Sequence, residues 1–405
     1  MIVTIERLGH LGDGIAPGPV YVPGMLPGEV VEGELEGSTL AKPRILAPSP
    51  QRVKPPCAHA RTCGGCALQH ASDDFVAGWK QAVVEAALAG QGLSAPFRPI
   101  VTSPPRSRRR ATLSARRTKV GVTVGFHARG SDMLVAVPDC RLLHPDLIAT
   151  FPAVATITEA GGSRKGELTL TVTRSLTGPD IAVAGGKALD ASLRQQIAAL
   201  AEAHGIARLT WDGEPVALRV PPVVAFDGIR VTPPPGAFLQ ATEAGEAALR
   251  DAVAEAVGGA RRVVDLFAGC GTFALPLARQ AEVHAVEGEA ALTGALAQGW
   301  RQAEGLKRVT TETRDLFRRP LVAEDLRGFD AAVIDPPRAG AEAQTRMLAE
   351  SGPPRIAAVS CNPVTFARDA AVLVAAGYRL DWVQVVDQFR WSTHVELVAC
   401  LTRTP

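Results

Sequence analysis

The last third of the chain alternates short apolar runs with helical segments, and this alternation constrains the fold more than any other feature. The apolar runs are RRVVDLF, EVHAVE, DAAVIDPP and RIAAVS, between residues 261 and 360. Strands that alternate with helices form βαβ units and therefore a parallel sheet. Near-continuous apolar runs suit strands that are covered on both faces. We predict an α/β fold, with a doubly wound, Rossmann-like sheet in residues 233–405.

The first two thirds of the chain have a different pattern. Residues 1–52 contain short apolar runs separated by Gly and Pro, which predicts a small all-β module. A Pro-rich linker, APSPQRVKPPC, begins at Ala47. Residues 53–232 are rich in short β-type runs and are interrupted by a predicted helix over ASLRQQIAALAEAHG. We therefore expect three domains, the second of them mainly β.

Residues 73–90 predict a further helix, ahead of the β-type runs of the second domain. Its apolar side chains recur near helical spacing, at Phe75, Trp79, Val83 and Leu88. Although it lies early in the chain, this helix is a candidate for packing on the third domain.

Charge is uneven along a chain whose net charge is only +2. Seven basic residues lie in one short stretch: Arg106, Arg108, Arg109, Arg110, Arg116, Arg117 and Lys119. Such a cluster can neutralise several phosphates of a nucleic acid. A solvated basic face is the more common explanation of an isolated cluster of this kind.

The start of the chain, MIVTIERLGHLGDG, has charges where a signal peptide needs an apolar core. No uncharged apolar run is long enough to span a bilayer. We therefore predict a cytoplasmic protein without a membrane partner. The sequence shows no evident protein partner, and it leaves the oligomeric state open.

The segment from Asp265 to Phe273, DLFAGCGTF, follows one buried strand and opens a helix. Gly269 and Gly271 permit a tight turn and the close approach of a ligand to the backbone. The next strand ends at Glu287, about 20 residues on, where an acid can bind ribose hydroxyls. Many such turns only pack a helix against a strand, but the turn, the acid and the strand context agree on a cofactor. The three-glycine spacing for a pyrophosphate is missing, so a nucleoside such as S-adenosylmethionine is favoured over a dinucleotide.

Two later strands end in polar motifs, DPPR from Asp335 and SCNP from Ser360. Ligands bind beyond the carboxyl ends of parallel strands, so both motifs should lie beside the cofactor. Cys361 is therefore a candidate nucleophile, although a cysteine after a strand is more often a small core residue. Near the end of the chain, HVELVAC offers the carboxylate Glu396, and the sequence alone favours an exposed carboxylate on an edge strand.

Four cysteines form a candidate metal site. Cys57, Cys63 and Cys66 lie in C-x5-C-G-G-C, and Cys140 follows much later. Three closely spaced thiols favour metal binding over a disulfide framework in a long chain without a secretory signal. A four-thiolate site can hold zinc or an iron–sulfur cluster, and the spacing alone leaves both open.

Together these motifs resemble the bacterial RNA uracil-5-methyltransferase family, and within it the iron–sulfur branch that modifies 23S ribosomal RNA. The resemblance covers essentially the whole chain. VYVPGMLPGEVV looks like the TRAM domain, an OB-like RNA-binding barrel, and CAHARTCGGC with Cys140 resembles the ligands of a [4Fe-4S] cluster. The methyltransferase motifs follow in order as GAFLQAT, DLFAGCGTF, AVEGE, RDLF, DPPR, SCNP and HVE.

The resemblance implies a class I methyltransferase domain in residues 233–405 that methylates carbon 5 of a uridine in RNA. The implied contacts of S-adenosylmethionine are Gln240, Phe267, Glu287, Asp315 and Asp335, with Gly269, Gly271 and Thr272 in the turn. Thr272 stands where relatives often have Asn. Cys361 would add to carbon 6 of the uracil, and Glu396 would remove the carbon 5 proton. The implied partner is 23S rRNA, gripped by the N-terminal barrel and the basic stretch, with tRNA as the alternative.

Three other activities are weaker interpretations. Methylation of an adenine amino group would use DPPR, but an Arg replaces the aromatic residue of that motif and Cys361 would have no role. Cytosine-5 methylation requires a second cysteine near the Asp-Pro-Pro motif, and this sequence has none there. A non-catalytic RNA-binding protein would not need Cys361, Glu396 and the glycine turn together.

Overall fold

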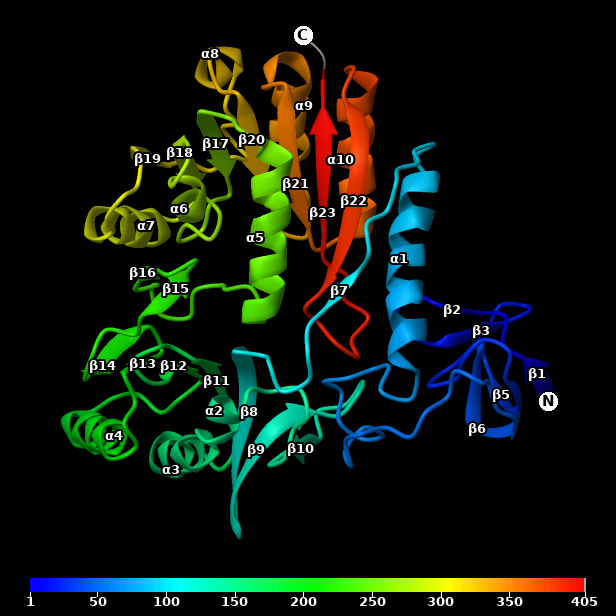
Figure 1. Cartoon of the computed structure of the whole chain (residues 1–405). Helices are drawn as coiled ribbons and strands as arrows, with labels where there is room; N and C mark the ends of the chain where they lie inside the picture. The colour runs from blue at the N-terminus through cyan, green and yellow to red at the C-terminus, as the bar shows by residue number, and fades with distance from the viewer. Residues whose placement is uncertain (404–405) are drawn as a thin grey trace.

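The computed structural model describes residues 1–403, so the last two residues of the predicted third domain lie outside the described part. An eight-stranded sheet dominates, with the order β19-β18-β17-β20-β21-β23-β22-β7 (Figure 1). Its strands are β7 (Val101–Thr102), β17 (Arg262–Leu266), β18 (Glu282–Glu287), β19 (Val309–Thr313), β20 (Ala331–Ile334), β21 (Arg355–Ser360), β22 (Arg379–Asp387) and β23 (Leu397–Thr402). Paired strands are parallel, except that β23 is antiparallel to β21 and β22. The predicted doubly wound sheet is confirmed.

The register aligns the carboxyl ends of three neighbouring strands. Leu266 of β17 pairs with Val286 of β18 on one side and with Ile334 of β20 on the other. The residues that follow therefore leave the sheet at the same level, at one edge. This edge carries the glycine turn and the two polar motifs.

Helices cover both faces of this sheet. One face packs on α5 (Glu243–Val257), α6 (Ala274–Leu277) and α7 (Ala290–Gln302). The other packs on α8 (Ala323–Leu326), α9 (Glu342–Ser351), α10 (Pro363–Ala375) and α1 (Asp73–Ala89). Successive residues of β17 alternate between the two apolar cores, with Val263 in the first and Val264 in the second. The near-continuous apolar runs follow from this double burial.

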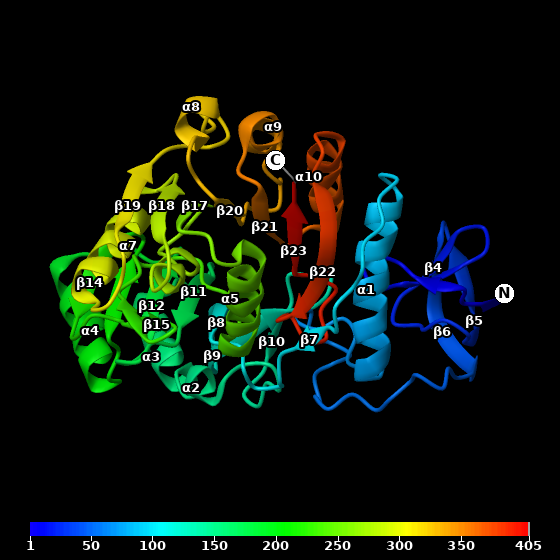
Figure 2. The ribbon, with the colours of Figure 1, turned by 45° about the horizontal axis from the view of Figure 1, so that its top comes forward.

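Helix α1 begins at the capping residue Ser72, whose side chain accepts a hydrogen bond from the Phe75 N–H. It contacts α10 and lies beside the N-terminal sheet in both views (Figures 1 and 2). The helix predicted over residues 73–90 is confirmed, but of the apolar residues noted at helical spacing only Leu88 is among its fully buried residues. The fully buried side chains are Val76, Lys80, Val84 and Leu88.

Lys80 is buried because it has a partner that the spacing of apolar residues cannot show. Its Nζ lies 2.6 Å from Asp387 Oδ1 and donates to the Phe389 carbonyl oxygen at 3.1 Å. Burial lowers the pKa of Lys80, and the Asp387 carboxylate opposes that shift. The pair joins α1 to the end of β22 across more than 300 positions of sequence.

The N-terminal sheet has the order β1-β5-β6-β4-β3-β2. Its strands are β1 (Ile2–Thr4), β2 (Arg7–Leu8), β3 (Gly14–Ala16), β4 (Val20–Val22), β5 (Val30–Glu36) and β6 (Thr39–Ala47). Their small apolar core includes Val3, Val22 and Val31. A second group, with Leu26 and Leu68, reaches Val76 of α1.

The central sheet has the order β10-β9-β8-β11-β12-β13-β14. Its strands are β8 (Arg110–Thr118), β9 (Gly121–His127), β10 (Leu134–Ala136), β11 (Leu168–Thr173), β12 (Asp180–Ala184), β13 (Arg208–Trp211) and β14 (Glu214–Leu218). The other elements here are α2 (Pro145–Ile148), α3 (Phe151–Gly161), the predicted helix α4 (Ala191–Ala203) and the hairpin of β15 (Val224–Phe226) and β16 (Ile229–Val231). Together these sheets confirm the predicted fold class, a Rossmann-like α/β domain accompanied by β domains.

The basic stretch is not one solvated or RNA-facing surface. Arg109 is buried, pairs with the buried Glu246 of α5, and donates from Nε to the Gln240 carbonyl oxygen at 3.0 Å. Arg110 donates to the Gly236 carbonyl oxygen at 3.0 Å. Both arginines therefore join the central sheet to the segment that enters α5, because a buried guanidinium needs acceptors for its fixed donors. Within residues 1–403, no helix is both long and apolar enough to cross a membrane.

Candidate active site

A cavity of about 880 Å3 opens at the carboxyl edge of the eight-stranded sheet. It is lined by nine of the ten residues that the sequence predicts for catalysis and cofactor binding: Gln240, Phe267, Gly269, Thr272, Glu287, Asp315, Asp335, Cys361 and Glu396. The aligned strand ends explain this convergence, since each of β17, β18, β20 and β21 delivers its next residues to the same edge. The tenth residue, Gly271, is not part of the cavity wall.

The turn after β17 uses left-handed backbone conformations at three residues. Gly269 has φ +55° and open space beside its Cα, so a ligand can approach the backbone there. Gly271 has φ +100°, and a Cβ there would lie 2.8 Å from the Leu275 side chain, so this glycine lets the turn pack on α6. Phe267 also has a positive φ of 62°, which costs a non-glycine residue about 1–3 kcal/mol. Its ring packs against Phe317 at a centroid distance of 5.4 Å.

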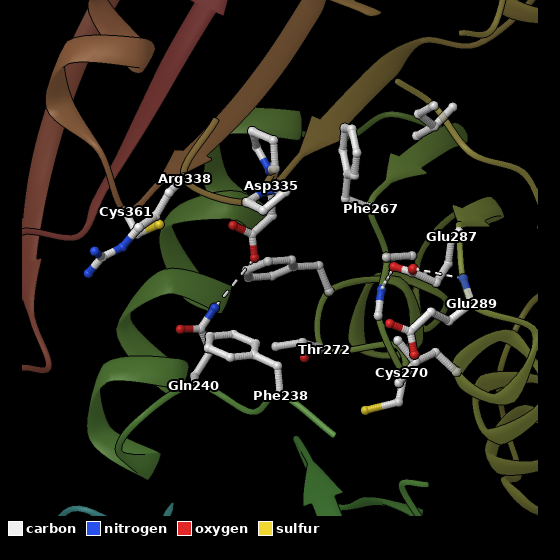
Figure 3. A pocket seen from close by; sticks show the side chains of 18 of the residues that line it. Phe238, Gln240, Phe267, Cys270, Thr272, Glu287, Glu289, Asp335, Arg338 and Cys361 are labelled. Atoms are coloured by element: carbon white, nitrogen blue, oxygen red, sulfur yellow. Dashed lines mark hydrogen bonds between the residues drawn. The ribbon is translucent and has the colours of Figure 1, made fainter. Parts of the chain in front are cut away.

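The Glu287 carboxylate is held in place by backbone donors at the end of β18. Gly269 N donates to its Oε2 at 3.0 Å, and Glu289 N donates to its Oε1 at 3.1 Å (Figure 3). Each carboxylate oxygen retains a further lone pair. The group can therefore accept hydrogen bonds from a diol in the cavity while it holds the glycine turn.

The cavity has two chemically different sides. Figure 3 shows Glu287 and Glu289 at one side, Cys361 and Arg338 at the other, and Asp335 between them. Gln240 Nε2 donates to Asp335 Oδ2 at 3.4 Å in this middle region. One side therefore offers acceptors for hydroxyl groups, and the other offers a thiol.

Cys361 follows β21 and is partly exposed to the cavity. Burial raises the pKa of its thiol to about 11, and the carboxyl groups of Glu396 and Asp335 add to this shift. Arg338 opposes the shift, because its positive charge stabilises the thiolate. Cys361 is thus not an inert core cysteine, but its thiolate depends on nearby charge.

Glu396 immediately precedes β23, which lies between β21 and β22, and only 3% of its surface is exposed. The interpretation of Glu396 as an exposed carboxylate on an edge strand is therefore wrong. Burial raises its pKa, repulsion from Asp335 adds to this rise, and a hydrogen bond from Gln388 opposes it. Burial also raises the pKa of Asp335. A carboxyl group with a raised pKa can exchange protons near neutral pH.

Several cavity residues were not predicted from the sequence to belong to this site. They are Arg108, Phe238, Phe317, Arg338, Phe389 and His394. Arg338 and His394 lie inside motifs quoted above, and Arg338 Nη2 is 2.7 Å from His394 Nδ1. Phe238, in GAFLQAT, keeps 64% of its surface exposed at the cavity. The sequence signal is the aromatic residue of the GAFLQAT motif, and its exposed ring offers a face for stacking a planar ring in the cavity.

The four cysteines of the predicted metal site lie near one another. Burial raises the pKa of Cys63, and repulsion from Cys140 and Cys57 adds to this shift. Burial likewise raises the pKa of Cys66 to about 12. Within residues 1–403, no group of three or more His, Cys, Asp or Glu side chains is arranged to hold a single metal ion.

Comparisons with known proteins agree on one family. Residues 235–404 match the family model described as tRNA (Uracil-5-)-methyltransferase. An uncharacterized RNA methyltransferase of Rhizobium meliloti is 45% identical over 99% of this chain and 99% of its own length. The 23S rRNA (uracil(1939)-C(5))-methyltransferase RlmD of Alkalilimnicola ehrlichii is 34% identical over 99% of this chain and 96% of its own length. The chain belongs to the RNA uracil-5-methyltransferase family.

A solved structure supports the fold of this RNA uracil-5-methyltransferase over its whole length. The crystal structure of Pyrococcus abyssi tRNA (uracil-54, C5)-methyltransferase in complex with S-adenosyl-L-homocysteine has a TM-score of 0.76. Its sequence is 22% identical, and the match covers 99% of both chains. The resemblance found in the sequence is confirmed at the level of the family, with RNA as the class of substrate and S-adenosylmethionine as the methyl donor.

Replacing Glu287 with Ala should weaken binding of S-adenosylmethionine. The change removes a charged hydrogen-bond acceptor from the cavity, and the loss should be on the order of 1.5–3 kcal/mol. Isothermal titration calorimetry measures it directly, with Glu282→Ala as the control at the exposed opposite end of β18. An affinity equal to that of the wild type would refute the assignment of Glu287.

Proposed function

We propose that the protein transfers a methyl group from S-adenosylmethionine to carbon 5 of a uridine in 23S rRNA, through a covalent adduct with Cys361. The observation that carries the proposal is the two-sided cavity. A thiol and a buried carboxyl group face it from β21 and β23, and the glycine turn with Glu287 lines it beyond β17 and β18. The methyl donor and the uracil ring can then meet between these two sides of the cavity, beside Asp335.

Carbon 5 of uracil is a weak nucleophile toward a methyl sulfonium, and addition of a thiolate to the ring makes it a stronger one. The Cys361 thiolate adds to carbon 6, and the electron pair of the 5,6 double bond makes carbon 5 enolate-like. Carbon 5 then attacks the methyl group, and S-adenosylhomocysteine leaves. Glu396 removes the carbon 5 proton, the double bond reforms, and the thiolate is expelled. The covalent intermediate splits one difficult step into two easier ones.

The cofactor would occupy the side of the cavity formed by the glycine turn. Glu287 would accept from the ribose hydroxyls, and Gly269 gives the open space for close approach. The remaining proposed contacts are Gln240, Phe267, Thr272, Asp315 and Asp335. Gly271 would act only through the turn, because its Cα packs on α6.

Cys361 and its neighbours would occupy the substrate side of the cavity. The uridine must be unpaired or flipped out of a helix to enter. The exposed Phe238 ring offers a stacking surface in the same cavity. Arg338, held by His394, favours the thiolate that starts the reaction.

We further propose that Cys57, Cys63, Cys66 and Cys140 hold a [4Fe-4S] cluster. The four thiols lie near one another, and four cysteine thiolates are the ligand set of such a cluster. The cluster would contribute structure rather than electrons, because methyl transfer needs none. The Ala67 and Leu68 N–H groups, next to Cys66, donate to the Trp391 carbonyl oxygen at 2.8 and 2.9 Å. The cluster segment would thus brace the loop that leads to Glu396.

One observation favours 23S rRNA as the target. The relative named as a 23S rRNA methyltransferase is 34% identical across almost the whole chain. The N-terminal sheet and the cysteine segment resemble a TRAM domain and a cluster-binding region, but they do not separate the two targets, because the similar tRNA methyltransferase structure matches 99% of this chain. We propose that residues 1–52, 53–232 and 233–405 act as the RNA-binding, cluster-binding and methyltransferase domains. tRNA is the second candidate, because the matching family model and the similar solved structure are described as tRNA methyltransferases.

The target RNA can be tested with the purified protein and labelled S-adenosylmethionine. Deproteinised 23S rRNA from cells that lack this gene should accept one methyl group, and tRNA should accept little. Mapping 5-methyluridine in both RNAs, with and without the gene, identifies the position. Preferential methylation of tRNA would replace 23S rRNA in the proposal.

Cys361→Ala and Glu396→Gln should fail at different steps. The first variant lacks the nucleophile, so neither adduct nor 5-methyluridine should form. The second should transfer the methyl group and then stall as a protein–RNA adduct, visible as a slow band on a denaturing gel. The buried Cys400, outside the cavity, provides the control variant Cys400→Ala. A Cys361→Ala enzyme with the wild-type rate would refute the mechanism.

Protein purified without oxygen should contain iron and sulfide and should absorb broadly in the visible range. Replacing any one of the four cysteines with Ser should reduce the iron content, because each thiolate is proposed to bind one iron. Cys270→Ser is the matched control, since Cys270 is a buried cysteine of the glycine turn. Zinc in place of iron would contradict the cluster.

A further inference from the structure

Gln388 is a buried side chain that contacts two residues of the cavity wall, Gln240 and Glu396, but does not line the cavity itself. It follows β22 directly, and 1% of its surface is exposed. Its Nε2 lies 2.5 Å from Gln240 Oε1 and 3.3 Å from Glu396 Oε2. Its Oε1 accepts a hydrogen bond from Ala241 N at 2.6 Å. All the polar atoms of this amide therefore have partners inside the protein.

The backbone fixes the orientation of this amide. The Ala241 N–H can only donate, so the atom that faces it must be the oxygen of Gln388. The two hydrogens of Nε2 then point to Gln240 and Glu396. Gln240 receives a donor at its own oxygen, which turns its Nε2 toward Asp335 Oδ2. Gln388 therefore determines which group Gln240 presents to the cavity.

The same amide acts on the ionisation of Glu396. A donor directed at Oε2 stabilises the carboxylate and leaves Oε1 as the oxygen that can take up a proton. Asp335, at the end of β20, and the thiolate of Cys361, after β21, oppose the carboxylate. Arg338 favours the carboxylate form of Glu396. His394, in the same loop as Glu396, also lines the cavity and carries no negative charge. Gln388 is thus the hydrogen-bond donor to Glu396, in a site with two other acidic groups.

Hydrogen bonds hold the backbone beside Gln388 and also the backbone of its partners Gln240 and Ala241. Lys80 of α1 binds the Asp387 carboxylate and the Phe389 carbonyl oxygen. The Arg109 side chain donates to the Gln240 carbonyl oxygen, and the Arg109 backbone N–H donates to the Ala241 carbonyl oxygen at 3.0 Å. Neither the backbone beside Gln388 nor the backbone at Gln240 and Ala241 can therefore move to accommodate a rotation of the Gln388 amide.

We propose that Gln388 is a positioning residue that orients Gln240 and prepares Glu396 to accept the carbon 5 proton. This inference rests on the proposed function of Glu396 as the base. Gln388 does not contact the substrate, so its effect passes through these two side chains. It predicts a change in pH dependence, which a general loss of packing would not produce.

Gln388→Met tests the proposal, because Met has a similar length and volume but no donor. Loss of one hydrogen bond to a charged group should raise the pH at which adduct release is half-maximal by about one unit. At neutral pH, release of 5-methyluridine should slow on the order of tenfold, and adduct should accumulate. Gln384→Met is the matched control, since Gln384 lies on β22, shortly before Gln388, and donates to the Pro99 carbonyl oxygen. A Gln388→Met profile that superimposes on the wild type would overturn the proposal.

A second measurement needs no methyl transfer. The rate of Cys361 alkylation by iodoacetamide, followed by mass spectrometry of its peptide, reports the ionisation of the thiol. If Glu396 stays neutral to a higher pH in Gln388→Met, more of the Cys361 thiol should be ionised near neutral pH, and its alkylation there should be faster than in the wild type. An unchanged rate would contradict the proposal. Wild-type protein that methylates no RNA would instead refute the proposed function, while the alkylation rate still tests the contact between Gln388 and Glu396.

Circular dichroism shows first whether Gln388→Met folds. If it does not, Gln388→Asn takes its place, because this amide is one methylene shorter and cannot reach Gln240 and Glu396 together. The same faster alkylation is expected for Gln388→Asn. Equal alkylation rates for Gln388→Asn and wild type would overturn the proposal.

Discussion

The buried ion pair between Lys80 and Asp387 is the contact on which the arrangement of the cavity depends. A charge removed from water is costly, and it is tolerated only when a partner and further hydrogen bonds satisfy it. Lys80 meets this condition with the Asp387 carboxylate and the Phe389 carbonyl oxygen. The pair fixes α1 against the loop after β22, and Gln388 and Glu396 are placed by that loop. An early helix thus becomes part of the environment of the late motif that contains Glu396, the proposed base.

The cavity gathers groups that disfavour one another's charges. Asp335, Glu396 and the Cys361 thiol lie close enough for each negative charge to raise the pKa of a neighbour, and burial strengthens the effect. Arg338 and the Gln388 amide oppose this repulsion. Such opposing influences bring the pKa values of acidic groups toward neutral pH, so that these groups can exchange protons during a reaction. The strained backbone at Phe267 adds a local cost at the same cavity.

Individual residues show where interpretation of the sequence succeeded and where it could not. The glycine turn, Glu287, Asp335 and Cys361 were found because each directly follows a recognisable apolar strand. Glu396 was misjudged as an edge residue, because the sequence does not show that β23 inserts between β21 and β22. Arg109 was misjudged as part of a basic surface because its Glu246 partner lies far along the chain. Gln388 carries no local pattern at all, and its proposed role follows only from its contacts with Gln240, Ala241 and Glu396.

The sequence by itself determined the alternation of strands and helices, the doubly wound sheet and the family, because periodicity and motif spacing are local properties of the chain. It also located the thiol and the acids that follow the strands, since parallel strands deliver their carboxyl ends to one edge. The tertiary structure alone decided that Lys80 and Arg109 are buried, that Glu396 faces the cavity and that one amide joins Gln240 to Glu396. These are pairings between residues far apart in sequence. Whether a charged or polar side chain is buried depends on its partner in space, and no local pattern records that partner.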